Sequence, residues 1–282
     1  MELFVTGGTG FVGCHFVRQA LARGHSVRAL RRPSAAPRLE PQAGVRWIDL
    51  PMDGELRGCF EGVDCVVHLA SHTPNPPYAP LEECLYWNVY ASLRLAQLAV
   101  EAGVLDFVVA GTYFEYGSAA LGMETIHPGT PLQPALSYPV SKAAASAAFA
   151  GLAREKGLRL QLLRIFQVFG EGESPKRFWP SLRRAAQAGE DFPMSAGTQI
   201  RDFIEVGEVA AAFVNALERE GVEAGKPQQR NVGTGRAQTL LEFANEWWAR
   251  WGATGSLLPG AVPARAGEMP RLVANVADVQ IG

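Results

Sequence analysis

The stretch Met1–Gly13, MELFVTGGTGFVG, decides the fold of this chain. Its apolar residues 3–5 predict a short buried strand, and the glycines after them predict a tight turn that opens a helix. Two glycine spacings overlap in it, Gly8-Thr9-Gly10-x-x-Gly13 and Gly7-x-x-Gly10-x-x-Gly13. Because a strand precedes the turn and a helix follows it, this pattern predicts a dinucleotide-binding site rather than a purely structural turn.

The residues expected to hold the dinucleotide lie at the C-terminal ends of successive strands, where ligands bind in open parallel sheets. At the first of these ends, a pyrophosphate would lie on the free N–H groups of the helix N-terminus. The residues assigned to this turn are Gly7, Gly10, Phe11, Val12 and Gly13. Later strand ends are predicted to add Asp49 and Leu50 beside the adenine, and Leu69 and Ala70 at the end of the fourth strand.

The end of the second predicted strand carries two basic residues, Arg31 and Arg32. Enzymes that bind NAD commonly place an acid there, which accepts hydrogen bonds from the ribose hydroxyls. Two guanidinium groups could instead hold a 2′-phosphate, although both could also be solvated loop residues. Because the acid is absent, the sequence favours NADP(H) over NAD(H) as the cofactor.

Strand and helix patterns alternate through the first half of the chain. Runs that predict strands lie at residues 25–30, 45–50, 64–70 and 107–111. With amphipathic helices between them, including one over 85–103, they predict an α/β fold with a doubly wound parallel sheet. We expect residues 1–166 to form a dinucleotide-binding Rossmann domain to which 202–220 return. The rest of 167–282 should form a smaller, interleaved α/β substrate-binding lobe.

Composition limits the class of protein. The 282 residues are 48% hydrophobic and 19% charged, and the formal net charge of −2 gives no electrostatic case for nucleic acid or an anionic membrane as partner. The four cysteines form no C-x-x-C pair and no cluster with histidine, which predicts reduced thiols and no metal site. No apolar run reaches membrane-spanning length, and the first strand begins at residue 2, so we expect a cytoplasmic protein without a signal peptide.

Two later stretches predict the chemistry. The fifth strand leads into Thr112, and the segment Tyr138-Pro-Val-Ser-Lys142 opens an alanine-rich helix. Tyr138 and Lys142 share one helix face, where an ammonium group would lower the pKa of the tyrosine and could also donate to the nicotinamide ribose. Thr112 is placed to hydrogen-bond a substrate carbonyl or alkoxide. Together the three side chains supply what carbonyl reduction needs.

The chain resembles the extended short-chain dehydrogenase/reductase family, in its nucleotide-sugar branch of epimerases, dehydratases and reductases. The resemblance covers residues 1–276 and rests on TGGTGFVG, DCVVHLA, the Tyr-Gly pair at 116–117, YPVSK, and the segments at 163–170, 199–209 and 265–268. It departs from the family pattern at Gln167, where asparagine is usual, at Phe169, where tyrosine is usual, and at Gly207-Glu208, where an aspartate is common.

The resemblance implies a catalytic set of Thr112, Tyr138 and Lys142. It also implies that Gln167, Arg201 and Arg265 contact the substrate, the two arginines near its diphosphate. Two alternatives stay open at this point. Arg201 could form a salt bridge with Asp202 or Glu205, and Arg265 could be a solvated loop residue.

The positions after Thr112 separate the reactions of the family. Its 4,6-dehydratases place an Asp-Glu acid/base pair where this chain has Tyr113 and Phe114, and its epimerising reductases carry a cysteine at the second position. Reduction and 4-epimerisation remain. The paired arginines after the second strand favour an NADPH-dependent reductase of a nucleotide-linked 4-keto-6-deoxy sugar, with Tyr138 as proton donor. The alternative is an NAD-dependent nucleotide-sugar 4-epimerase, and a remote one is a non-catalytic NADP(H)-sensing protein.

The alanine-rich helix, predicted over 141–153, has small residues that let a second helix approach closely. In the family this helix and the one over 85–103 form a dimer interface, so the resemblance implies a homodimer. Family members usually continue past the strand predicted at 272–276 with a helix, so it also implies a short C-terminus. The sequence leaves open the base, the sugar and whether Glu115 points into the site.

Overall fold

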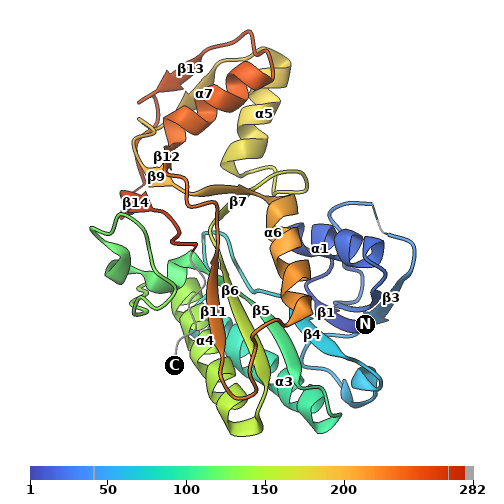
Figure 1. The fold of residues 1–282 in the computed structure, drawn as a ribbon. Coiled ribbons are helices and arrows are strands. Elements are labelled where there is room, and N and C mark those ends of the chain that lie inside the picture. Colours follow the sequence, from blue (N-terminus) through green and yellow to red (C-terminus); the bar gives the residue numbers. More distant parts are fainter. Residues whose placement is uncertain (41, 266, 277–282) are drawn as a thin grey trace.

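Seven parallel strands form the main sheet of the computed structural model, which describes residues 1–40, 42–265 and 267–276 (Figure 1). The sheet has the order β11-β6-β5-β4-β1-β2-β3. Its strands are β1 (Glu2–Thr6), β2 (Ser26–Arg31), β3 (Val45–Asp49), β4 (Cys65–His68), β5 (Asp106–Thr112), β6 (Arg159–Ile165) and β11 (Gln228–Val232). The order reverses at β1, which pairs with both β2 and β4. The prediction of a doubly wound parallel sheet is therefore confirmed.

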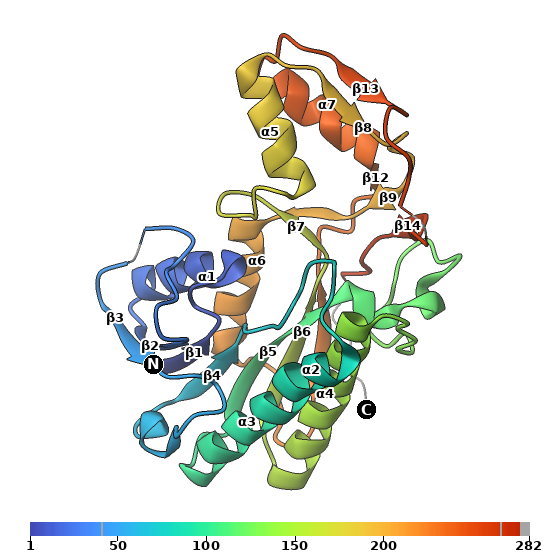
Figure 2. The ribbon, with the colours of Figure 1, turned by 180° about the vertical axis from the view of Figure 1, so that it is seen from behind.

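Helices cover both faces of this sheet. One face carries α1 (Phe11–Ala22) and α6 (Val206–Asn215), and the other carries α3 (Ser92–Glu101) and α4 (Ser137–Lys156) (Figures 1 and 2). Each face has its own hydrophobic core, so neighbouring residues of β5 go to opposite sides. Val108 packs with Phe16 and Phe213 under α1 and α6, whereas Phe107 packs with Phe149 under α4. Burial on both faces explains why the central strands are continuous apolar runs.

The helix predicted over 85–103 differs from the structure at both ends. It begins earlier, as α2 (Leu81–Leu85), continues through a π-helical stretch η2 (Tyr86–Ala91), and ends as α3. A π-helical turn widens the backbone and is often found at functional sites. The buried side chain of Asn88 lies in this stretch.

The remaining elements form a smaller lobe beyond the C-terminal end of β6, at the top of Figure 1. These elements are β7 (Gln167–Phe169), α5 (Phe178–Ala188), β8 (Phe192–Met194), β9 (Ile200–Arg201), β10 (Phe203–Glu205), β12 (Gln238–Thr239), α7 (Leu240–Arg250), β13 (Leu257–Pro259) and β14 (Arg271–Leu272). Helices α5 and α7 enclose a separate core that includes Leu182, Ala244 and Trp248. Trp179 also packs inward, with its ring edge-on to Trp247 and Trp251.

Two details of the sequence prediction are wrong. The chain returns to the main sheet beyond residues 202–220, because β11 forms the edge strand beside β6. This strand, QQRNV, has no apolar run because most of its residues are not fully buried at the sheet edge. The strand expected at 272–276 is only the two-residue β14.

Other compositional expectations concern cysteines, metals and membranes. All four cysteines are free thiols. Across residues 1–40, 42–265 and 267–276 there is no group of three histidine, cysteine or acidic side chains that could hold a metal ion. Within the same ranges, no helix has both the length and the apolar character needed to cross a membrane.

Gly13 gives the first testable prediction, because a Cβ at this position would lie 2.0 Å from the carbonyl oxygen of Gly7. The substitution Gly13→Ala must push the glycine turn open, so we expect it to lower the free energy of unfolding by about 2 kcal/mol or more in urea titrations. The matched control is Gly151→Ala on α4, where nothing lies within 4 Å of an added Cβ. That change should stabilise the helix by about 0.5–1 kcal/mol. Equal free energies for the two variants would contradict this account.

Candidate active site

The glycine turn between β1 and α1 is closed against the end of β4. Gly7 has φ +72°, and a Cβ there would lie 2.6 Å from the backbone nitrogen of Ala70. The N–H of Gly10 donates to the carbonyl of Gly7 at 2.9 Å, and α1 starts directly after Gly10. No side chain caps α1 and no acid lies in its first turn, so the N–H groups of residues 11–13 are available to an anion. The turn therefore fits the pyrophosphate of a dinucleotide.

A buried hydrogen-bond chain joins the ends of β1 and β4 beside this turn. The N–H of Ala70 donates to Thr6 Oγ1 at 3.2 Å, and Thr6 Oγ1 lies 2.8 Å from His68 Nδ1. We assign the hydroxyl proton of Thr6 to the bond with Nδ1, which puts the imidazole proton on Nε2. Burial, assisted by the charge of Lys142, lowers the pKa of His68 to about 3. The neutral imidazole thus holds the segment with Leu69 and Ala70 against the glycine turn.

Arg31 and Asp49, which were both expected to contact the cofactor, bind each other. Arg31 Nε lies 2.6 Å from Asp49 Oδ1 and a second guanidinium nitrogen lies 3.1 Å from Oδ2. The same guanidinium lies 5.0 Å from the ring centroid of Trp47. The hydrogen bond between Arg31 and Asp49 raises the pKa of Arg31 and lowers the pKa of Asp49. Arg32 is exposed and has no ion pair among the described residues.

The three predicted catalytic residues converge at the ends of β5 and α4. Thr112 ends β5, and Tyr138 and Lys142 lie on the first turns of α4; their exposed fractions are 8%, 6% and 4%. The phenol of Tyr138 is hydrogen-bonded to the hydroxyls of Ser71 and Thr112. Lys142 Nζ donates to the carbonyl of Ala110 at 2.8 Å. A phenol, an ammonium group and a hydroxyl therefore meet at the edge of the sheet where the dinucleotide turn lies.

The pKa of Tyr138 differs from the sequence expectation. We expected the ammonium group of Lys142 to lower it, but burial of the phenol raises it, and the hydrogen bonds from Ser71 and Thr112 only partly oppose this effect. Burial also lowers the pKa of Lys142, whereas the negative charge of Glu115 raises it. The phenol is therefore protonated at neutral pH.

Two residues beside Tyr138 were missed by the sequence reasoning. Ser71 follows Ala70 at the end of β4, and its hydroxyl is the second partner of the phenol. Tyr78 lies in the proline-rich loop after β4, with its ring centroid 5.4 Å from that of Tyr138. The position of Ser71 directly after a buried strand was a usable signal, because strand ends carry ligands in this fold. Nothing in the loop sequence pointed to Tyr78.

Buried Asn88 ties the loop after β4 to the start of α4. Its Oδ1 accepts from the N–H of His72 at 2.7 Å, and its Nδ2 donates to Ser141 Oγ at 2.9 Å. The hydroxyl of Ser141 in turn donates to the carbonyl of Tyr138 at 2.8 Å. These bonds fix the turn of α4 that carries both Tyr138 and Lys142.

Two of the predicted substrate residues already have partners within the protein. Gln167 Oε1 accepts from the hydroxyl of Tyr113 at 3.0 Å, which leaves the Gln167 amide nitrogen to donate elsewhere. Arg201 is buried and pairs with Glu268 at 3.1 Å. The expected alternative partners are not used. Asp202 accepts from Thr234 and Gly235, and Glu205 caps α6.

The charges of three arginines act on the rings of Tyr78 and Tyr113. Burial raises the pKa of Tyr78, and the charges of Arg177 and Arg265 oppose it. Burial likewise raises the pKa of Tyr113 to about 12, opposed by Arg201 and Arg177. Exposed Arg265 is thus within electrostatic reach of the site, and Arg177 joins the two predicted arginines. Such a cluster can hold a diphosphate.

Comparisons with known proteins place these features in context. A family model described as "NAD dependent epimerase/dehydratase family" matches residues 3–233. A UDP-glucose 4-epimerase of Corynebacterium glutamicum is 30% identical over 98% of this chain and 87% of its own length. A dTDP-4-dehydro-6-deoxy-D-allose reductase of Streptomyces bikiniensis is 31% identical over 86% of this chain and 78% of its own length. The solved structure of MoeE5 in complex with UDP-glucuronic acid and NAD has a TM-score of 0.83 and 30% identity, covering 98% of this chain and 90% of that chain.

The pKa of His68 gives a prediction for stability. The unfolded chain takes up a proton on this residue below its ordinary pKa of 6.5, whereas the folded chain does so only near pH 3. Stability is therefore lost as the pH falls from 6.5 toward 3, by about 2 kcal/mol between pH 7 and pH 5. In urea titrations we expect His68→Asn to remove most of this loss, and the exposed His127→Asn to retain it. If His68→Asn lost as much free energy of unfolding between pH 7 and pH 5 as the wild type, protonation of the buried imidazole would not be what destabilises the folded protein.

Proposed function

Because this chain belongs to the NAD-dependent epimerase/dehydratase family of nucleotide-sugar enzymes, we propose that it reduces a nucleotide-linked 4-keto-6-deoxy sugar with NADPH. One observation carries the proposal. The phenol of Tyr138 is buried, protonated at neutral pH and hydrogen-bonded to Thr112, one helical turn from Lys142. A protonated phenol beside a second hydroxyl is suited to give a proton to a ketone oxygen.

The neighbours of Thr112 support reduction over elimination. Tyr113 is stacked on Phe114 and Phe166, and its hydroxyl is held by Gln167. The two residues after Thr112 offer no acid/base pair, because the hydroxyl of Tyr113 already donates to Gln167 and Phe114 has no titratable group. Both carboxylate oxygens of Glu115 bind groups inside the protein.

Each residue of the site has its own role in the reduction of the ketone. When bound, the nicotinamide supplies the hydride. Thr112 holds the C4 oxygen of the sugar through its hydroxyl, and Tyr138 delivers the proton as negative charge develops on that oxygen. Lys142 would donate to the nicotinamide ribose, and the hydroxyls of Ser71 and Thr112 stabilise the phenolate that remains. Gln167, Arg177, Arg201 and Arg265 hold the nucleotide diphosphate, with Arg177 leaving Glu173 and Arg201 leaving Glu268 to do so.

The preference for NADPH rests on the end of β2, which carries Arg31 and Arg32 and no acid. Arg32 supports the preference most directly, because it is exposed and free of ion pairs among the described residues. A second candidate, an NAD-dependent nucleotide-sugar 4-epimerase, is favoured by the pair between Arg31 and Asp49, which occupies one of the two guanidinium groups. The relatives named as UDP-glucose 4-epimerases and the NAD in MoeE5 agree with this second candidate.

The test of the reaction compares two substrates. We expect steady loss of NADPH absorbance with dTDP-4-keto-6-deoxyglucose, and Tyr138→Phe should slow it by about 100-fold or more because the proton donor is lost. The dissociation constant of NADPH in that variant should stay within about 2-fold of wild type, since the phenol does not hold the cofactor. The exposed Tyr90→Phe is the matched control and should keep the wild-type rate. Interconversion of UDP-glucose and UDP-galactose without net cofactor loss would instead support the epimerase, and full activity of Tyr138→Phe would contradict both.

We also propose that the protein is a homodimer through α4 and the helical segment 81–101. These elements lie together on one face of the sheet (Figure 2), and α4 exposes small side chains there, including Ala147. Tyr86 and Tyr90 are exposed on the neighbouring segment, with ring centroids 5.6 Å apart. Small and aromatic side chains in one exposed face are suited to close helix packing.

Light scattering during size-exclusion chromatography tests the dimer. We expect twice the mass of one chain at micromolar concentration, and a monomer for Ala147→Arg, because a guanidinium group cannot be buried between closely packed helices without a partner. The matched control is Ala249→Arg, which changes an exposed alanine of α7 on the smaller lobe and should leave the dimer intact. A monomeric wild-type protein would refute the proposal.

A further inference from the structure

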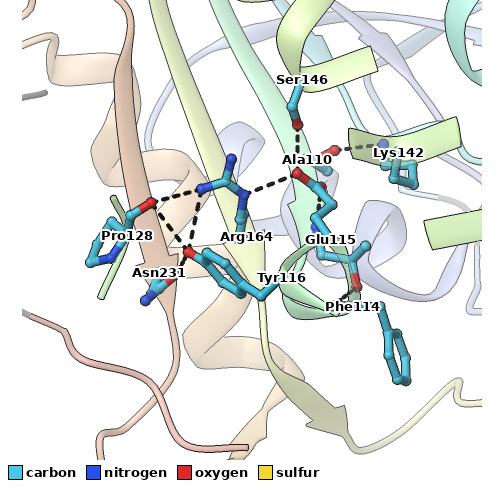
Figure 3. Close-up of polar contacts among 10 residues, drawn as sticks. Ala110, Phe114, Glu115, Tyr116, Pro128, Lys142, Ser146, Arg164 and Asn231 are labelled. Carbon is cyan, nitrogen blue, oxygen red and sulfur yellow. Dashed lines mark hydrogen bonds and ion pairs between the residues drawn. The ribbon is translucent and has the colours of Figure 1, made fainter. Parts of the chain in front are cut away.

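Glu115 is a fully buried carboxylate that the reaction described above does not use. It lies in η3 (Tyr113–Tyr116), the short 3-10 helix that directly follows Thr112. Its side chain has 0% exposure, and that of its ionic partner Arg164 has 1%. Figure 3 shows this carboxylate pointing into the protein, between β6 and α4. A buried charge is costly unless every one of its atoms is paired, so its partners indicate its role.

Two of the three partners of Glu115 come from β5 and α4, the elements that carry the catalytic set, and the third comes from β6 (Figure 3). Oε1 accepts from the backbone N–H of Thr112 at 2.8 Å. Oε2 accepts from Ser146 Oγ at 2.7 Å and from Arg164 Nε at 2.9 Å. Ser146 lies on α4, one helical turn beyond Lys142 and two beyond Tyr138. One carboxylate therefore fixes the end of β5 relative to the catalytic face of α4.

The same contacts orient the hydroxyl of Thr112. Glu115 and Thr112 form a capping box, in which Thr112 Oγ1 accepts from the N–H of Phe114 at 3.4 Å. A lone pair of the Thr112 oxygen is then occupied by this N–H, and the single hydroxyl proton is left for the phenol of Tyr138 or, once substrate binds, for the substrate oxygen. The direction of this proton depends on the turn that Glu115 closes.

Glu115 also sets the charge around Lys142. The groups that interact with this ammonium group are the carbonyl of Ala110 on β5, neutral His68 on β4, and Glu115 itself. Glu115 also holds a second buried cation, Arg164 on β6, which is bound in addition by the hydroxyl of Tyr116 and by the carbonyl of Pro128 (Figure 3). Glu115 is thus the one carboxylate among the described contacts of these two buried cations.

We propose that Glu115 is the positioning residue of this active site, which sets the orientation of the Thr112 hydroxyl and keeps Lys142 charged at the place where it meets the nicotinamide ribose. This inference rests on the proposed function, because it assigns Glu115 a role in the same hydride-transfer site. Glu115 acts through Thr112 and Lys142 and touches no reacting atom.

The first test is a double-mutant cycle between Glu115 and Thr112, measured as NADPH oxidation with dTDP-4-keto-6-deoxyglucose. We expect Glu115→Gln to lower kcat by about 10-fold or more with little change in KM, because the oriented hydroxyl acts in the transition state. In the Thr112→Ala background, Glu115→Gln should cause a smaller loss, since the hydroxyl it orients is gone and only its effect on Lys142 remains. Additive losses would overturn the proposal.

The second test does not depend on the sugar. Tryptophan fluorescence gives the dissociation constant of NADH, and of NADPH, as a function of pH. Because the charge of Glu115 raises the pKa of Lys142, its removal should move the loss of affinity at alkaline pH to lower pH, by about 1 pH unit. An unchanged midpoint would overturn the proposal. If no sugar nucleotide is turned over, the proposed function fails while this midpoint still decides the role of Glu115, and failure to bind either cofactor overturns both.

The matched control is Asp106→Asn, at the opposite end of the same strand β5. Asp106 is also a buried carboxylate paired with arginines, Arg159 at 2.5 Å and Arg219, but it lies far along the strand from Thr112. The substitution Asp106→Asn should lower the free energy of unfolding and leave kcat and the pH midpoint of cofactor binding unchanged. If Asp106→Asn reproduced the effects of Glu115→Gln, the proposal would be overturned. Should Glu115→Gln not fold because Arg164 is left unpaired, the double substitution Glu115→Gln/Arg164→Gln removes both charges together and is measured in its place.

Discussion

The structure depends on backbone packed directly on backbone where β1 turns into α1. The carbonyl of Gly7 lies where a side chain on Gly13 would be, and Gly7 itself lies against the backbone of Leu69 and Ala70 at the end of β4. Three chain segments can come this close only because two of the contact residues have no Cβ. The contact brings the start of α1, the end of β4 and the crossover of the sheet to one place. Every residue of the site is positioned relative to it.

From this contact the site extends along the ends of the strands. Thr6 and His68 join β1 to β4, the loop after β4 brings Ser71 to the phenol of Tyr138, and Thr112 ends the next strand of the sheet. Helix α4 completes the set from the side. The chemistry is therefore built from side chains at adjacent strand ends and the first turns of one helix. That arrangement holds groups in place more firmly than a site made of loops alone.

Much of this could be predicted from short stretches of sequence, because the physical reason was local. The glycine spacing, the buried run of β4 and the four-residue step from Tyr138 to Lys142 each determine their own geometry, and the fold and family predictions are confirmed.

The features of the site that could not be predicted depend on strand register and on burial. The pair of Arg31 with Asp49 exists because these residues lie opposite each other in β2 and β3. The raised pKa of Tyr138 follows from the burial of its phenol, which the spacing of residues in the sequence does not reveal. Site roles, cofactor preference and dimer remain predictions.

The path of the chain between the two lobes limits how enzymes with this fold can acquire a new substrate preference. The chain leaves the main sheet after β6, returns through β10 to α6, and supplies β11 before re-entering the smaller lobe at β12. Asp202, at one of these crossings, holds the backbone of Thr234, Gly235 and Ala274 with a single buried carboxylate. No single cut separates the lobes, so exchanging one of them between relatives would require several simultaneous junctions. New substrate preferences on this scaffold are therefore reached most readily by replacing individual side chains above a fixed frame.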